Sequence, residues 1–172
     1  RLQRHDIGAG DFDFIMINLD SYHDHETSYN FAVNPSRSIN DAVSSSGGGG
    51  GRRSDISWDP VWEVATQITE EGWSAEMRIP FSQLRFSSDE EQVWGIQMRR
   101  TVWRRNEWNH LTWLPLSVGR MGGPSSNRVS LYGTLVGLEA PPPRVLLEVN
   151  PWRIFGMCDD DSADLGRSLV HI

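Results

Sequence analysis

The segment from Trp73 to Ile79 alternates strictly between apolar and polar side chains, and this pattern constrains the fold more than any other in the chain. Successive side chains of a strand point to opposite faces, so the apolar set shares one face of a half-buried strand. Pro80 cannot donate to a β-ladder, and we therefore expect the strand to close there. Residues 81–86 should then form a short helical turn or an irregular crossing. The alternation restarts over residues 92–100 and predicts a second strand.

Further alternating segments predict more strands of the same kind. Residues 14–19 and 28–33 should pair antiparallel across a polar turn at residues 21–26. A hairpin is expected from Val61 to Ile79, and a late strand over residues 129–135 carries glycines on one face, where a neighbouring backbone could approach. Short strands, polar turns and almost no helical periodicity indicate an all-β fold, an antiparallel β-sandwich.

Composition excludes several classes of function. The net charge is −7 and the 16 basic residues are all arginine, which argues against a general nucleic-acid surface and removes every mechanism that needs a lysine. No apolar run approaches the roughly 20 residues of a membrane helix. The run SSSGGGGG at residues 44–51 predicts a flexible loop, and it lacks the Gly-Lys-Ser/Thr ending of a phosphate loop.

The strand segments together resemble a known family. The segments are GWSAEMRIPFSQLRF at 72–86, QVWGIQMRR at 92–100, DFDFIMINLDSYHDHETSYNFAVNP at 11–35, SDISWDPVWEVAT at 54–66 and NRVSLYGTLVGLE at 127–139. This cadence is similar to the family 9 carbohydrate-binding modules, in the version that precedes a predicted outer-membrane β-barrel in a bacterial family. The resemblance implies a jelly-roll-like sandwich that is N-terminally truncated, because such modules begin with additional strands.

The resemblance also implies a domain division, a location and partners. Residues 1–139 would be the sandwich, residues 140–143 (APPP) a stiff linker, and residues 144–172 the start of a C-terminal barrel domain, truncated or disordered at its end. The parent protein would be exported, periplasmic or associated with the outer membrane, and linked to carbohydrate catabolism. The partners would be a polysaccharide or oligosaccharide and the barrel of the same parent.

A sugar site needs aromatic faces for stacking and planar polar groups for the hydroxyls. Trp62, Trp73 and Trp94 have the apolar parity of their strands and should be core. The opposite face of the 92–100 strand carries an amide, a guanidinium and an indole, and two further tryptophans lie in polar loops as a candidate stacking pair. The candidate sugar-binding residues are Trp58, Gln97, Arg99, Trp103 and Trp108, of which Trp58 and Trp108 form the expected pair. The alternatives are a solvated sheet face and, for the stacking pair, core packing.

Aspartates gather at the ends of the first expected strand. Asp11, Asp13, Asp20 and Asp24 offer hard oxygen ligands, and both this chemistry and the resemblance suggest a structural calcium ion. The alternative is that they form and cap turns. His23 and His25 flank Asp24 and raise the possibility of zinc, but with one Cys and no other histidine near in sequence a surface turn is the favoured interpretation.

The sequence does not favour catalysis. Glu63 and Glu76 lie on paired strands, but on their polar faces, so we expect exposed cross-strand residues rather than a glycosidase pair. No Gly-x-Ser-x-Gly motif is present. We therefore predict a non-catalytic carbohydrate-binding module. The rival hypothesis is a structural or gating domain that covers the barrel without binding sugar.

Overall fold

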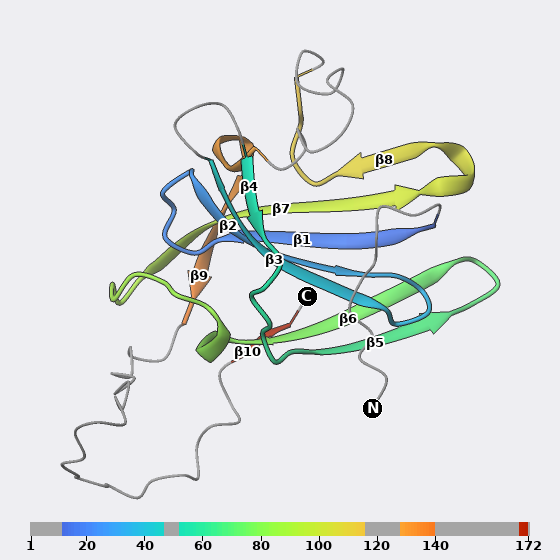
Figure 1. Cartoon of the computed structure of the whole chain (residues 1–172), viewed down its shortest axis with the longest axis horizontal. Helices are drawn as coiled ribbons and strands as arrows, with labels where there is room; N and C mark the ends of the chain where they lie inside the picture. The colour runs from blue at the N-terminus through green and yellow to red at the C-terminus, as the bar shows by residue number, and fades with distance from the viewer. Residues whose placement is uncertain (1–11, 47–51, 116–127, 140–168, 172) are drawn as a thin grey trace, which may run out of the picture.

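The computed structural model describes residues 12–46, 52–115, 128–139 and 169–171, and this part of the chain is built almost wholly from antiparallel strands (Figure 1). Three short 3-10 turns interrupt them: η1 (Phe81–Gln83), η2 (Trp103–Arg105) and η4 (Val129–Leu131). The strands are β1 (Phe14–Asp20), β2 (Thr27–Val33), β3 (Ile39–Ser46), β4 (Arg52–Asp55), β5 (Glu63–Ile68), β6 (Trp73–Pro80), β7 (Gln92–Val102), β8 (Glu107–His110), β9 (Gly133–Leu138) and β10 (Leu169–His171). The prediction of an all-β antiparallel sandwich is confirmed.

Two sheets form the sandwich. The larger has the strand order β4-β3-β2-β1-β7-β8, with β9 also paired to β7, and the smaller has the order β10-β6-β5 (Figure 1). Apolar side chains from both sheets and from η1 meet between them. The most deeply buried are Ile17, Leu19, Phe31, Val33, Met77, Ile79 and Trp94. The alternation that predicted the strands therefore also identifies the face of each strand that enters the core.

The predicted hairpin from Val61 to Ile79 is confirmed as the β5–β6 pair. Thr69 and Gly72 close its turn through backbone hydrogen bonds of 2.7 and 3.4 Å. Pro80 ends β6 and η1 follows directly, as the missing amide hydrogen of proline predicted. Glu63 and Glu76 are exposed, and Glu63 pairs with Arg78 across the hairpin at 3.3 Å. The expectation that these glutamates are exposed cross-strand residues is confirmed.

The centre of the outer face of the large sheet is buried as well, although most of its residues are polar. β1 lies between β2 and β7, so that Asn18 faces Asn30 on one side and Gln97 on the other. These three side chains and their neighbours are nearly inaccessible to solvent. The buried polar residues of this outer face are Asn18, Asp20, Ser28, Asn30, Ser44, Gln97 and Thr101. The sandwich thus has an apolar layer inside and a second, polar layer outside the same sheet.

One prediction near the end of the chain needs correction. Residues 129–131 form the turn η4, and the late strand β9 begins only at Gly133. Residues 169–171 form β10, which pairs with β6. The expected linker at residues 140–143 and most of the expected C-terminal domain lie outside the described residues. Within the described ranges no helix has the length and apolar character needed to cross a membrane.

Candidate functional site

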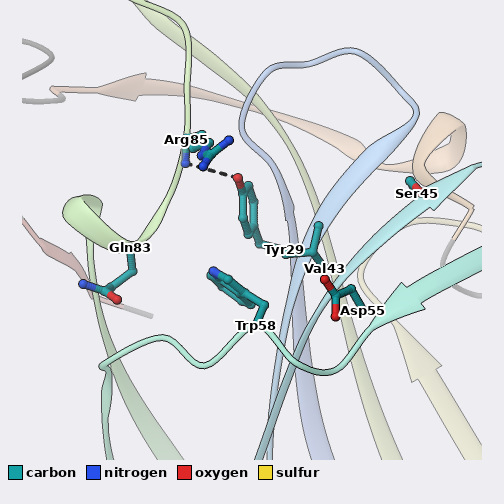
Figure 2. A pocket seen from close by; sticks show the side chains of 7 residues that line it. All are labelled: Tyr29, Val43, Ser45, Asp55, Trp58, Gln83 and Arg85. Carbon is teal, nitrogen blue, oxygen red and sulfur yellow. Dashed lines mark hydrogen bonds between the residues drawn. The ribbon is translucent and has the colours of Figure 1, made fainter. Parts of the chain in front are cut away.

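A pocket of about 520 Å³ opens beside the loop that joins β4 to β5 (Figure 2). Its lining residues come from β2, β3, the end of β4, this loop, η1 and the segment that follows η1. Its lining residues are Tyr29, Val43, Ser45, Asp55, Trp58, Gln83 and Arg85. The pocket therefore combines two aromatic rings with an amide, a guanidinium, a carboxylate and a hydroxyl.

Trp58 is held in this pocket by aromatic packing. Its ring centroid lies 5.0 Å from that of Tyr29 and 5.6 Å from that of Phe31, in tilted and edge-on arrangements. Such geometries are favoured between aromatic rings, so the indole is anchored on β2. Trp58 remains partly exposed while it lines the pocket. It has the combination of rigidity and access that a stacking platform needs.

The polar lining groups are also positioned by hydrogen bonds. The Gln83 Oε1 atom accepts the Val61 amide at 2.9 Å, which fixes its side chain beside the loop. The Tyr29 hydroxyl accepts the Arg85 amide at 3.3 Å (Figure 2). Burial raises the pKa of Tyr29, so the phenol stays protonated at neutral pH and keeps its own hydrogen to donate.

Asp55 supplies negative charge at the rim of the pocket. Its Oδ1 atom accepts the Ser57 hydroxyl at 2.6 Å and the Ser57 amide at 2.9 Å. These two hydrogen bonds hold the pKa of Asp55 below its ordinary value, because they stabilise the ionised form. A carboxylate that is ionised and solvent-exposed is a ready acceptor for ligand hydroxyl groups.

Gln97 is the sequence-predicted site residue whose surroundings differ most from expectation. It is fully buried, and its Nε2 atom donates to the Thr112 hydroxyl while its Oε1 atom accepts the Thr112 amide at 3.1 Å. The expectation of a ligand-facing amide must therefore be corrected, because the segment around Thr112 covers this part of the outer face. Gln97 acts in the structure as a buried bridge between β7 and that segment.

The other predicted residues lie near the β7–β8 end of the large sheet. The Arg99 guanidinium sits 4.7 Å from the centre of the Phe14 ring, a cation–π contact. Trp108 pairs with Thr101 across the two strands and is 47% exposed. Trp103 begins η2, is 45% exposed, and its amide donates to Asp13 at 2.7 Å.

The expected stacking pair does not form. Trp58 packs on Tyr29 and Phe31, which point toward the core between the sheets. Trp108 is paired with Thr101, which lies three positions beyond the core-facing Met98 and so on the opposite face. The two tryptophans belong to different surfaces because the large sheet separates them.

The four aspartates of the calcium hypothesis are not brought together either. Asp13 precedes β1 and Asp20 ends it, which separates them by the length of a seven-residue strand, about 20 Å or more. Asp20 accepts the amides of Asp24 and His25 at 3.1 and 2.9 Å, and Asp24 accepts the amides of residues 26 and 27. The alternative that these two aspartates cap the turn is confirmed, and Asp11 lies outside the described residues.

Sequence reasoning found Trp58 but missed the rest of the pocket. Tyr29 and Arg85 are 56 positions apart, and Gln83 follows a strand of the other sheet. The proline that ends β6 was the available signal, since it predicted a turn that could present side chains at the sheet edge. The identity of the residues it would meet depends on the sandwich packing, which local patterns do not encode.

Comparison of the chain with family models, with curated proteins and with solved structures finds no match. The function of the chain is therefore inferred from the geometry of the pocket and the chemistry of its lining residues.

Proposed function

We propose that this domain is a non-catalytic carbohydrate-binding module that takes a polysaccharide or oligosaccharide at the Trp58 pocket. The observation that supports it most directly is the pocket itself, which places an anchored, partly exposed indole among Ser45, Asp55, Gln83 and Arg85 (Figure 2). A pyranose ring presents C–H groups on its faces and hydroxyls around its edge. An aromatic platform surrounded by hydrogen-bonding groups complements both features.

The size of the pocket agrees with this assignment. Its volume of about 520 Å³ lies within the range of roughly 300–1,000 Å³ that small-molecule sites occupy. Asp55 at the end of β4 and the next two residues of the loop are exposed, so this part of the pocket lining is accessible to solvent. This supports recognition of a segment of a glycan rather than complete enclosure of a free sugar.

The lining groups support binding rather than hydrolysis. A glycosidase needs two carboxylates at a defined separation, one of them with a raised pKa. Asp55 is the single carboxylate among the lining residues that the structure describes, and its pKa is lowered. We therefore expect no release of reducing sugar by this chain.

The wider setting of the domain rests on the sequence resemblance. It favours an exported parent protein in the periplasm or at the outer membrane, with a role in carbohydrate catabolism and a C-terminal barrel in the same chain. On this proposal the module would hold a glycan near the barrel. Calcium, which the resemblance also suggests, would be a structural addition, and a melting curve that does not change after exhaustive chelation would remove it.

The test is a calorimetric screen of soluble xylo- and cello-oligosaccharides against the wild-type domain and matched tryptophan variants. Trp58→Ala should remove a stacking contact of about 1–3 kcal/mol, which lowers affinity by roughly tenfold or more. Trp113→Ala is the control, because Trp113 is 80% exposed and lies outside the pocket lining. Thermal melting of both variants should confirm that each remains folded.

A Trp108→Ala variant separates the two surfaces that carry predicted sugar-binding residues. If sugar binding depends on Trp108 and not on Trp58, the site belongs on the outer face beside Arg99 and Trp103, and the pocket assignment fails. If affinity falls only with Trp58→Ala, the pocket is the site. Absence of any glycan binding by the folded domain would contradict the proposed function altogether.

One observation favours the structural or gating alternative. Trp103, Trp108 and Trp113 are 45%, 47% and 80% exposed, and large exposed aromatic side chains are enriched at protein interfaces. These residues could pack against the barrel that the resemblance places in the same parent. Failure of the glycan screen, together with burial of these indoles in the full parent protein by fluorescence quenching, would favour this alternative.

A further inference from the structure

The turn between β1 and β2 gathers three metal-ligating side chains. Asp20, His23 and His25 each place a ligand atom within 4.8 Å of the others. The cluster shares no residue with the Trp58 pocket. It also differs from the aspartate set that the sequence suggested for calcium, because two of its three members are imidazoles.

Asp20 brings a fully buried carboxylate to this cluster. Its two oxygens each accept one backbone amide, from Asp24 and from His25. A buried carboxylate costs free energy unless hydrogen bonds or a nearby cation compensate it. Each of its oxygens also keeps a further lone pair, because a carboxylate can accept about four hydrogen bonds in all. The carboxylate can therefore serve the turn and a cation at once.

His23 brings an orphaned ring nitrogen. Its Nδ1 atom is buried and has no hydrogen-bond partner in the structure, which is unusual for a buried polar atom. Its ring centroid lies 4.5 Å from that of His25. A cation bound to Asp20 and to this nitrogen would give the nitrogen a partner and offset the charge of the carboxylate.

We infer that Asp20, His23 and His25 form a site for a divalent transition metal, with zinc as the best match. Imidazole nitrogen with one carboxylate oxygen is a ligand set that zinc takes readily, usually with a fourth position for water. Calcium instead requires six to eight oxygen ligands, whereas this cluster offers one carboxylate and two imidazole rings. The residues of this turn therefore do not fit calcium.

Binding would require a small closure of the cluster. Zinc bonds of about 2.0–2.2 Å place tetrahedral ligand atoms roughly 3.3 Å apart, closer than the present limit of 4.8 Å. His25 is exposed and free to adjust its ring, whereas Asp20 is fixed in the sheet. The metal would then fasten the β1–β2 hairpin at the end opposite Asp13.

The experiment is a titration of the chelator-treated domain with zinc chloride, and in parallel with calcium chloride, followed by calorimetry and thermal melting. The expected result is one zinc ion per chain and a melting temperature that rises with zinc and not with calcium. His23→Asn and His25→Asn should each weaken zinc binding tenfold or more. Asparagine is the chosen replacement because both histidines have positive φ, 52° and 60°, which asparagine tolerates. His110→Asn is the control for an imidazole elsewhere on the large sheet.

Cobalt gives an independent measurement. Cobalt(II) at a site with two imidazoles should produce visible absorption bands in the wild-type domain and in His110→Asn, and lose them in His23→Asn. The inference is overturned if zinc does not bind, if both turn variants bind zinc as tightly as wild type, or if calcium raises the melting temperature as much as zinc. Melting without metal should show that His25→Asn is folded, since that side chain is exposed.

Discussion

Both faces of the large sheet are buried at its centre, but they are built from opposite chemistry. The inner face presents Ile17, Phe31 and Trp94 to the smaller sheet. The alternate positions of the same strands form the outer face, which presents Asn18, Asn30 and Gln97. These three residues are also only 0–5% exposed. Residue parity therefore separates apolar from polar side chains, yet it does not separate buried from exposed ones.

The difference lies in what stabilises each face. Inner side chains stabilise the fold because their apolar surface is removed from water, and this effect depends little on the exact orientation of each side chain. Outer side chains stabilise the fold only where their polar atoms have hydrogen-bond partners. Asn30 illustrates this, since its amide donates to the Ala42 carbonyl at 3.0 Å and to the Ser44 hydroxyl at 2.8 Å. Two other outer-face atoms, Asn18 Oδ1 and Thr101 Oγ1, are buried without a partner among the described residues and cost free energy, so the stability of this layer depends on the hydrogen bonds that are made.

The largest expected effect is on the inner face, from Trp94→Ala. Trp94 is fully buried, packs against Phe81 and Phe86, and donates its indole hydrogen to Gln92 at 3.0 Å. Truncation should lower the free energy of unfolding by about 3–5 kcal/mol, because it removes buried apolar area and leaves a cavity. Chemical denaturation of both proteins measures this difference.

The control for that prediction is Trp113→Ala, which removes the same side chain from an exposed position. Its effect on stability should stay within about 0.5 kcal/mol. Similar losses in the two variants would show that burial at the core does not decide the stability of this sandwich. The expected difference between a tryptophan buried at the inner face and one exposed to solvent would then be wrong.

The next largest effect should come from the outer face, with Asn30→Ala. The variant removes the donor to the buried Ser44 hydroxyl and to the Ala42 carbonyl, so we expect a loss of about 1–3 kcal/mol. Asn109→Ala is the matched control, since Asn109 is exposed and its side chain bonds only to the partly exposed Glu107 among the described contacts. If Asn30→Ala melts like wild type, the outer layer does not depend on its hydrogen bonds.

The inner face was predictable from sequence because its signal is local. Alternation over a few residues placed Trp94 and Met77 in the core, and Pro80 fixed the end of β6. The same rule failed at residues 129–131, where apolar residues two apart belong to a 3-10 turn. A segment of three residues is too short for its period to distinguish a turn from a strand.

The outer face and the pocket were not predictable because their partners are distant in sequence. Gln97 is covered by Thr112, and Ser28 meets Tyr132 from 104 positions away at 3.3 Å. Polar side chains at alternate positions of a strand do not indicate whether a later segment of the chain will cover that face of the sheet. Trp58 was found because a tryptophan in a polar loop is unusual, but its companions are assembled only when the two sheets pack.

Gly95→Ala tests how tightly the outer layer is packed. An added Cβ atom would lie 3.0 Å from the Asp20 Cβ atom and 3.3 Å from the Asp20 Oδ2 atom, closer than most such contacts. We expect a loss of about 1–2 kcal/mol from overpacking, measured by thermal melting. Gly137→Ala is a useful comparison, because there the new atom meets nothing within 4 Å and any cost reflects the φ of +79°. A stable Gly95→Ala protein would mean that the layer can expand.

The smallest expected effect is a pH dependence from His110, which faces Arg99 across β7 and β8. Burial, with a smaller contribution from the positive charge of Arg99, holds the pKa of His110 below its ordinary value of 6.5. The unfolded chain then binds a proton more readily than the folded one, so stability is greatest above pH 6.5 and falls as the pH is lowered through the folded pKa.

Because His110 is partly exposed, solvent screens this effect, and the slope should be a small fraction of the roughly 1.4 kcal/mol per pH unit that one full proton would give. His110→Gln should flatten the fall in melting temperature between about pH 7 and pH 5. All other ionisable groups are common to both proteins, so the difference between their two curves isolates this imidazole. If the melting temperature of the variant falls as steeply with pH as that of the wild type, the fold does not disfavour protonation of His110. The outer layer would then be more open to solvent at His110 than around Asn18 and Gln97.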